Sequence, residues 1–127
     1  MTKLEAQQQQ FNRALKRLEE VLVVEPKTDI TRDSAIQQFE LTLDLAWKTA
    51  KTYLEENKGI ICVSPKECFR EAYRQGLLRY DDEWIQLADL RNETVHTYNE
   101  EIAERIFLQL PVAVDKFKDL ATSLGEI

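Results

Sequence analysis

The longest helical pattern in the chain is centred on residues 39–48, which read Phe39-Glu40-Leu41-Thr42-Leu43-Asp44-Leu45-Ala46-Trp47-Lys48. Apolar residues recur here at the three- and four-residue spacing that places them on one face of an α-helix. That face comprises Ile36, Phe39, Leu43, Trp47, Ala50 and Leu54. We therefore expect a long helix from about Arg32 to Asn57, with Gly59 as its C-cap.

Helical spacing of apolar residues continues on both sides of this segment. A first helix is expected from Lys3 to Val24, ended by Pro26. A third begins at Ser64-Pro65-Lys66-Glu67, because serine, proline and glutamate in this order form an N-cap, a first turn and a capping box. This short helix ends near Gly76.

The last part of the chain predicts two more helices. A fourth is expected from Glu83 to Val95, capped by Asp81 or Asp82. A fifth follows the N-cap Asn99 and is kinked where Pro111 interrupts its apolar stripe.

The composition supports a helical fold. With three Gly and three Pro in 127 residues, the chain is too poor in turn residues for a β-sandwich or barrel. We predict a single all-α domain over residues 1–127. Its expected architecture is an antiparallel up-and-down bundle of about four core helices plus a short one.

Charge and hydropathy limit the kind of protein. The N-terminus is polar, and no apolar run approaches the roughly 20 residues of a membrane span. We therefore expect a cytoplasmic protein that does not enter a membrane. The net charge of −6 argues against broad electrostatic binding of nucleic acid, although it leaves room for a local basic site.

Cys62 and Cys68 are the only cysteines. In a cytoplasmic protein we expect them to be free, inert thiols. A metal site would need a second cluster of cysteine or histidine, and the sequence offers none. We therefore expect neither a metal nor a cofactor.

The reactive side chains gather in Arg91-Asn92-Glu93-Thr94-Val95-His96-Thr97-Tyr98, which contains the only histidine. Arginine can hold a phosphate, histidine exchanges a proton near neutral pH, and tyrosine offers a modifiable hydroxyl. On a helical projection, Arg91 falls on the same apolar face as Trp84, Ala88 and Val95. A guanidinium buried without a partner is very costly, so Arg91 needs a carboxylate, a partner chain or an anion.

One interpretation of this segment is structural. Arg91 would pair with Glu40 or Asp44 of the long helix, whereas Asp44 could instead pair with Lys48 on the helix surface. His96 would be a capping or hydrogen-bonded core residue, and Tyr98 a core aromatic.

The other interpretation is phosphodiester chemistry on RNA without a metal. His96 would act as general acid or base, Arg91 would stabilise charge on the phosphorus centre, and Asn92 would orient the histidine or the phosphate. Glu40 and Asp44 would then hold Arg91 in place. Because each chain has one histidine, two acid–base groups would require a symmetric dimer.

Two further features could serve RNA binding. Trp47 and Trp84 could stack on bases, but both lie on apolar stripes, where core or interface positions are more usual. Lys66, Arg70 and Arg74 form a row on the third helix, but neighbouring glutamates favour a solvated, ion-paired face.

Arg91-Asn92 followed by His96 and Tyr98 resembles the R-x4-H-x-Y signature of HEPN domains, specifically those paired with minimal nucleotidyltransferases. Residues 39–48 are similar to the second-helix block of this family. Ser64-Pro65-Lys66-Glu67 and Arg70-Glu71-Ala72 are similar to the start of its third helix. With Trp84 and residues 89–100, these blocks cover most of the span from about Gln38 to Ile106.

The resemblance implies a helical bundle that dimerises through the face carrying the motif. It implies an RNase toxin of a two-gene toxin–antitoxin pair, with Arg91, Asn92 and His96 as catalytic residues. The cognate nucleotidyltransferase would be the antitoxin and would neutralise the toxin by transferring AMP to Tyr98. An alternative within the family is a non-catalytic subunit that presents a substrate to the nucleotidyltransferase.

Overall fold

A computed structural model describes residues 1–125, and these residues are helical throughout, apart from short connections. The elements are α1 (Lys3–Leu22), α2 (Asp29–Lys58), α3 (Pro65–Arg74), α4 (Asp81–Glu93), the 3-10 helix η1 (Thr94–His96) and α5 (Glu100–Gly125). The all-α prediction is confirmed.

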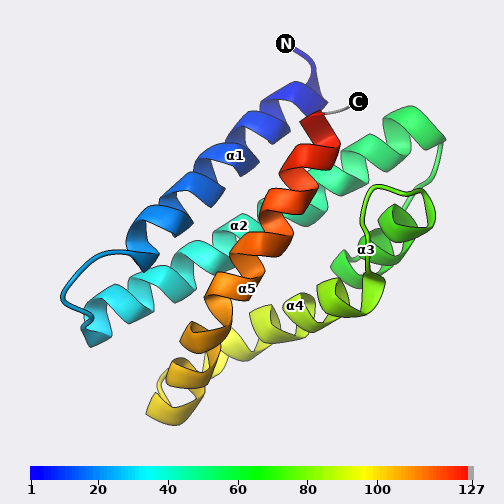
Figure 1. Cartoon of the computed structure of the whole chain (residues 1–127). Coiled ribbons are helices and arrows are strands. Elements are labelled where there is room, and N and C mark those ends of the chain that lie inside the picture. The colour runs from blue at the N-terminus through cyan, green and yellow to red at the C-terminus, as the bar shows by residue number, and fades with distance from the viewer. Residues whose placement is uncertain (126–127) are drawn as a thin grey trace.

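Helix α2 is the centre of the bundle. It lies antiparallel beside α1, α5 crosses the pair, and α3 and α4 pack together on the other side (Figure 1). Helix α2 contacts each of the other four α-helices in the described range. The bundle therefore forms around the segment in which the sequence pattern was longest.

Aromatic rings from several helices meet in the core. Phe117 of α5 is fully buried, and its ring centroid lies 6.0 Å from that of Phe11, 6.1 Å from Phe39 and 5.8 Å from Trp84. Trp84 also packs on Phe69 of α3 at a centroid distance of 4.9 Å. Trp84 is thus a core residue and presents no free face to a base.

The start of α2 is fixed by a reciprocal capping box. Thr28 Oγ1 accepts a hydrogen bond from the backbone N–H of Thr31, and Thr31 Oγ1 accepts one from the backbone N–H of Thr28. The helix therefore begins at Asp29, earlier than expected, because threonine can complete a box as glutamate does. Its end follows the prediction, since Gly59 adopts the left-handed conformation with φ 67°.

The N-terminal caps of α4 and α5 agree with the sequence prediction only in part. The predicted capping of α4 by Asp81 or Asp82 is wrong: Tyr80 occupies the N-cap, and both aspartates lie in the first turn, where the helix dipole favours them. Asn99 caps α5 as predicted, since its Oδ1 accepts backbone hydrogen bonds from the first turn. Helix α5 continues through Pro111 without interruption.

The expectation of two free thiols is wrong, because Cys62 and Cys68 form a disulfide with a Cα–Cα distance of 5.3 Å. Ser64 Oγ accepts a hydrogen bond from the backbone N–H of Glu67, which fixes the turn into α3 between the two cysteines. Both cysteines are fully buried. A cytoplasmic location predicts free thiols, but this turn brings the two cysteines within the Cα–Cα distance of a disulfide.

Within residues 1–125, no helix is both long enough and apolar enough to cross a membrane.

Candidate functional site

The reactive segment lies where α4 ends. The helix stops at Glu93, and Thr94 to His96 form one 3-10 turn before α5. Thr94 is buried, and its hydroxyl donates to the backbone carbonyl of Arg91 at 2.7 Å. A 3-10 helix has about three residues per turn and an α-helix about 3.6, so the side chains that follow no longer lie on the face expected from an α-helix. Val95, expected on the buried face, is consequently 66% exposed.

Arg91 lies against α2, where the sequence placed its partners. Its Nε and Nη2 atoms each lie 3.4 Å from an oxygen of Asp44, and its Nη1 lies 3.8 Å from Glu40 Oε2 and 3.4 Å from Thr94 Oγ1. The predicted pairing with Asp44 and Glu40 is confirmed. Among the ion pairs of residues 1–125, none joins Asp44 to Lys48, so that alternative is wrong.

The contacts of Arg91 are open to exchange with a ligand. They are longer than the 2.7–2.9 Å of a tight charge-assisted hydrogen bond. The Arg91 side chain is 30% exposed, and the carboxylates of Asp44 and Glu40 are also partly exposed. An anion can therefore reach the guanidinium, but it must compete with two carboxylates for its donors.

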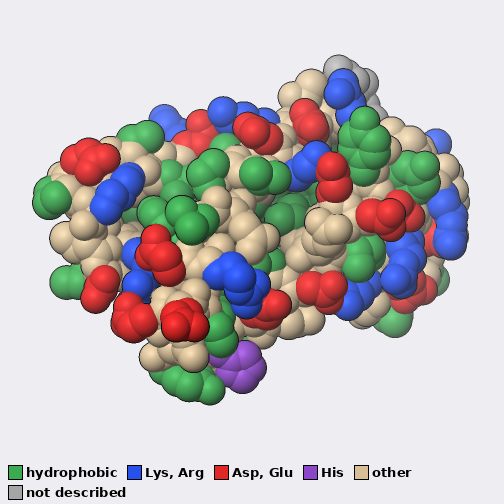
Figure 2. Space-filling view, turned by 60° about the horizontal axis from the view of Figure 1, so that its bottom comes forward, with side chains coloured by type: hydrophobic (Ala, Val, Ile, Leu, Met, Phe, Trp, Pro, Cys, Tyr) green, Lys and Arg blue, Asp and Glu red, His purple; other side chains and the backbone are tan. Residues whose placement is uncertain are grey.

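His96 and Tyr98 lie on the surface, so their interpretation as core residues is wrong. Tyr98 is 82% exposed, and His96 is exposed as well. Figure 2 shows the histidine, the only one in the chain, projecting from the molecular surface. The Tyr98 hydroxyl lies 3.4 Å from His96 Nδ1, with the ring centroids 5.9 Å apart. A group added to the Tyr98 hydroxyl would stand beside the imidazole.

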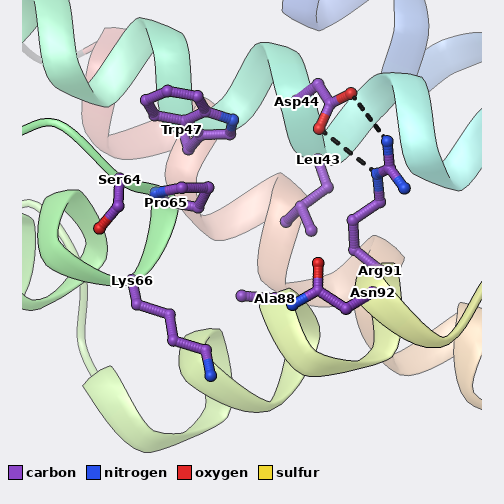
Figure 3. A pocket seen from close by; sticks show the side chains of 9 residues that line it. All are labelled: Leu43, Asp44, Trp47, Ser64, Pro65, Lys66, Ala88, Arg91 and Asn92. Atoms are coloured by element: carbon purple, nitrogen blue, oxygen red, sulfur yellow. Dashed lines mark hydrogen bonds and ion pairs between the residues drawn. The ribbon is translucent and has the colours of Figure 1, made fainter.

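A cleft of about 530 Å³ opens between α2, the start of α3 and α4. Arg91 lies at one end of this cleft and Trp47 at the other, with Asn92 and Lys66 along the wall that faces α2 (Figure 3). The volume falls within the range of small-molecule sites. His96 and Tyr98 are not among the lining residues, so the structure brings Arg91, Asn92 and Asp44 together but leaves the histidine outside this cleft.

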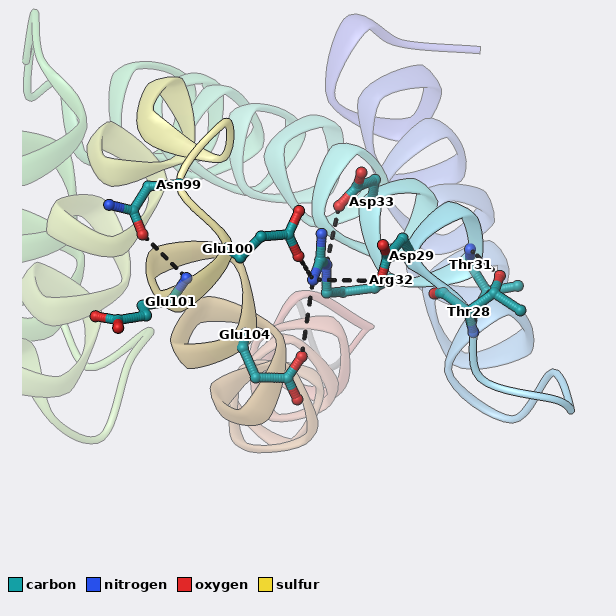
Figure 4. A network of polar contacts seen from close by, with 9 residues as sticks. All are labelled: Thr28, Asp29, Thr31, Arg32, Asp33, Asn99, Glu100, Glu101 and Glu104. Carbon is teal, nitrogen blue, oxygen red and sulfur yellow. Dashed lines mark hydrogen bonds and ion pairs between the residues drawn. The ribbon is translucent and has the colours of Figure 1, made fainter.

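A second arginine, Arg32, holds the segment that follows the motif, and the sequence did not single it out. Its side chain is only 8% exposed, and its Nη1 donates to Glu100 Oε2 at 2.8 Å (Figure 4). Its Nε donates to Asp33 at 3.0 Å, with Asp29 and Glu104 within 4.0 Å. This cluster ties the first turn of α5 to α2 just after Tyr98.

The Arg32 cluster shifts the protonation of its members. The hydrogen bond from Arg32, and then its charge, hold the pKa of Glu100 below the ordinary value for glutamate. Hydrogen bonds to Glu100 and Asp33 raise the pKa of Arg32, against the opposing effect of burial. Asp29 and Asp33 flank Arg32 in the sequence, but the contact with Glu100 spans 68 positions and has no local signature.

Comparison with known proteins agrees with this architecture. A crystal structure of a Thermus thermophilus protein is similar to the chain with a TM-score of 0.83 and 38% sequence identity, over 90% of this chain and 98% of that protein. A Haemophilus influenzae protein, described as the substrate binding domain of a nucleotidyltransferase, has the same fold with a TM-score of 0.69 and 24% identity over 96% of both chains.

Sequence comparisons add a relative and a family. A probable ribonuclease HepT from Haemophilus influenzae is 35% identical over 80 residues. The aligned segment covers 60% of this chain and only 55% of that relative. Residues 6–126 match the family model described as nucleotidyltransferase substrate binding protein like. The chain therefore belongs to this HEPN-like family of nucleotidyltransferase substrate-binding proteins.

Proposed function

We propose that the protein is a metal-independent endoribonuclease, the HEPN toxin of a two-gene toxin–antitoxin pair. The observation that carries the proposal is an accessible guanidinium at the end of a cleft, five positions before an exposed histidine on a fixed turn. The similarity to a probable ribonuclease HepT supports the same activity.

In the proposed mechanism, His96 removes the proton of an RNA 2′-hydroxyl. The 2′-oxygen then attacks the adjacent phosphorus, the bond to the 5′-oxygen breaks, and that oxygen takes up a proton. Arg91 stabilises the charge that builds on the phosphoryl oxygens, and Asn92 positions the phosphate beside it. Asp44 and Glu40 orient Arg91 from α2.

A second acid is needed to protonate the leaving oxygen. Each chain carries one histidine. A symmetric dimer through the motif face would supply the second imidazole from another copy, since a two-fold interface repeats the same patch on both chains. The exposed Val95 and Tyr98 would lie at this interface.

The proposed antitoxin is a cognate nucleotidyltransferase that transfers AMP from ATP to the Tyr98 hydroxyl and releases pyrophosphate. The hydroxyl is accessible and lies 3.4 Å from His96 Nδ1. A phosphodiester-linked AMP at this position would place bulk and negative charge beside the imidazole. It would hinder access of the RNA phosphate to the site.

A second candidate function is a non-catalytic subunit that presents a substrate to the nucleotidyltransferase. The position of the cleft favours it, because a ligand could occupy the space between Trp47 and Arg91 without meeting His96. It predicts a nucleotidyltransferase complex that binds a nucleotide equally well with His96→Ala.

The test is incubation of AMP-free protein with RNA in the presence of a metal chelator, followed by analysis of the product ends. We expect fragments with 2′,3′-cyclic phosphate and 5′-hydroxyl ends. Absence of cleavage by AMP-free protein under all conditions would reject the ribonuclease. Intact-mass measurement of wild type and Tyr98→Phe after incubation with the partner and ATP tests the modification, which only the wild type should acquire.

A further inference from the structure

Trp47 is the point at which two hollows of the surface meet. It lines the cleft of about 530 Å³ that contains Arg91, and it also lines a second hollow of about 250 Å³ between α1 and the end of α2. Unlike Trp84, which is 2% exposed, Trp47 is only partly buried. The indole therefore borders both hollows along α2.

Cations gather on both sides of this indole. The first hollow contains Arg91 and Lys66, and the second contains Lys3, Lys48 and Lys51. The carboxylates lining the two hollows are Asp44 and Glu55. The lining residues thus carry five cations and two carboxylates, and two further carboxylates, Asp89 and Glu40, pair with Lys66 and Arg91. The cations still outnumber the carboxylates here, whereas the whole chain has 17 Lys and Arg against 23 Asp and Glu. Its charge is opposite to that of the molecule.

The local contacts leave most of these cations available. Lys51 Nζ lies over the Trp47 ring, 5.9 Å from its centroid and within cation–π distance, so a base must stack from the side of the cleft that contains Arg91 or displace this ammonium. Among residues 1–125, no carboxylate lies within 4.0 Å of the amino group of Lys48 or Lys51. Lys66 does have such a partner, Asp89 at 2.5 Å, but both side chains are substantially exposed.

We propose that this surface, which we name the Trp47 track (Lys3, Lys48, Lys51, Trp47, Lys66 and Arg91), binds single-stranded RNA along α2. One unpaired base stacks on Trp47. Phosphates on one side of that base contact Lys66 and Arg91, and phosphates on the other side contact Lys48 and Lys51. Surfaces that bind single strands combine cations that contact the phosphates with an aromatic ring on which a base stacks.

The track deepens the proposed ribonuclease function and rests on it, since it would deliver the strand to Arg91. It specifies a single strand, because a base in a duplex is stacked on its neighbours and cannot also pack on the indole. An acidic protein segment would match the lysines but would gain nothing particular from Trp47.

The test measures binding of a fluorescent RNA oligonucleotide of about eight nucleotides, within the usual range of single-strand site sizes. Its 2′-hydroxyls are methylated so that wild-type protein cannot cleave it. Fluorescence anisotropy then gives Kd as a function of salt for each variant.

The expected effects separate stacking from charge. Trp47→Leu should raise Kd about 5- to 150-fold, as for loss of one stacked base, and Trp47→Phe should restore most of the affinity. Lys48→Gln and Lys51→Gln should each reduce the slope of log K against log salt by about 0.7. Lys118→Gln is the control, because Lys118 is an exposed lysine of α5 that pairs with Glu19 at 3.5 Å and lines neither hollow. Its slope should equal that of the wild type.

Several results would overturn the track. One is a folded Trp47→Leu variant that binds RNA as tightly as wild type, and another is a duplex that binds as tightly as the single strand. A third is a loss of salt slope in Lys118→Gln equal to that in Lys48→Gln or Lys51→Gln. The last is polyglutamate that displaces the bound RNA as effectively as unlabelled RNA does. The last result would indicate an acidic protein partner. Failure of the track and failure of the nuclease remain distinguishable. Trp47-dependent binding without cleavage of ordinary RNA rejects only the nuclease, whereas cleavage with Trp47-independent binding rejects only the track.

Discussion

Replacement of Arg91 by methionine separates a functional arginine from a structural one. The substitution keeps most of the apolar stem and removes the guanidinium with its contacts to Asp44 and Glu40. Because these contacts are 3.4 to 3.8 Å long and all three side chains are 30–39% exposed, water screens the pair. Ion pairs of this kind contribute about 0–1 kcal/mol. We therefore expect Arg91→Met to lower the free energy of unfolding by about 1 kcal/mol or less.

The same change should have a much larger effect on cleavage. If Arg91 stabilises charge on the phosphorus centre, its loss should lower kcat about 10²- to 10³-fold, as for removal of one transition-state donor. Urea unfolding followed by circular dichroism gives the stability, and cleavage of a fluorogenic RNA gives the rate. We expect a folded, dimer-competent protein that is nearly inactive.

Arg32→Met supplies the matched stability control. Arg32 is a buried arginine with two charged hydrogen bonds of 2.8 and 3.0 Å. The carboxylates of Glu100 and Asp33 are exposed, but the bonds are shorter than those of Arg91 and the Arg32 side chain is only 8% exposed, so this variant should lose more stability than Arg91→Met. A loss of about 3 kcal/mol or more in Arg91→Met, as for a broken buried pair, would refute the reasoning and favour a purely structural motif.

Three further predictions concern the scaffold. Phe117→Ala should lower the free energy of unfolding by about 3–5 kcal/mol in urea, because it empties the meeting point of four helices. Arg32 lowers the folded-state pKa of Glu100, so wild type should be more stable than Glu100→Gln. This difference in unfolding free energy should be full above the ordinary glutamate pKa of about 4.3 and should vanish as pH falls through the lowered pKa. A difference that grows in acid would contradict this prediction. Reduction of the disulfide should lower the free energy of unfolding by about 2 kcal/mol, because the unfolded chain regains loop-closure entropy. Cys62→Ser cannot form the disulfide with Cys68, so reductant should not lower its stability further.

The sequence predicted the local elements and one distant contact, because an arginine on an apolar face needs a partner. The apolar spacing of residues 36–54 correctly identified the central helix, and the interruption of an apolar face by Arg91 correctly predicted its pairing with Asp44 and Glu40. Asn99 was found as a cap because its side chain acts on the residues that follow it directly.

The sequence failed where a few residues change the chain direction or where a distant contact leaves no pattern in the sequence. The α-helix does not continue past Glu93, because the buried Thr94 hydroxyl stabilises a 3-10 turn that exposes Val95, His96 and Tyr98. The Arg32–Glu100 pair depends on how α5 docks on α2, which spacing does not encode. Likewise, Trp47 and Trp84 occupy similar apolar stripes, and only the packed structure shows which indole faces a cleft.

The rate of RNA cleavage by His96→Ala, relative to wild type, tests the central claim most directly. His96 is exposed, so its replacement should leave the helix content and thermal stability unchanged. Loss of a general acid–base group should lower the rate at least about 10²-fold. Equal rates for the two proteins would contradict the account, as would wild-type protein, free of AMP, that cleaves no RNA.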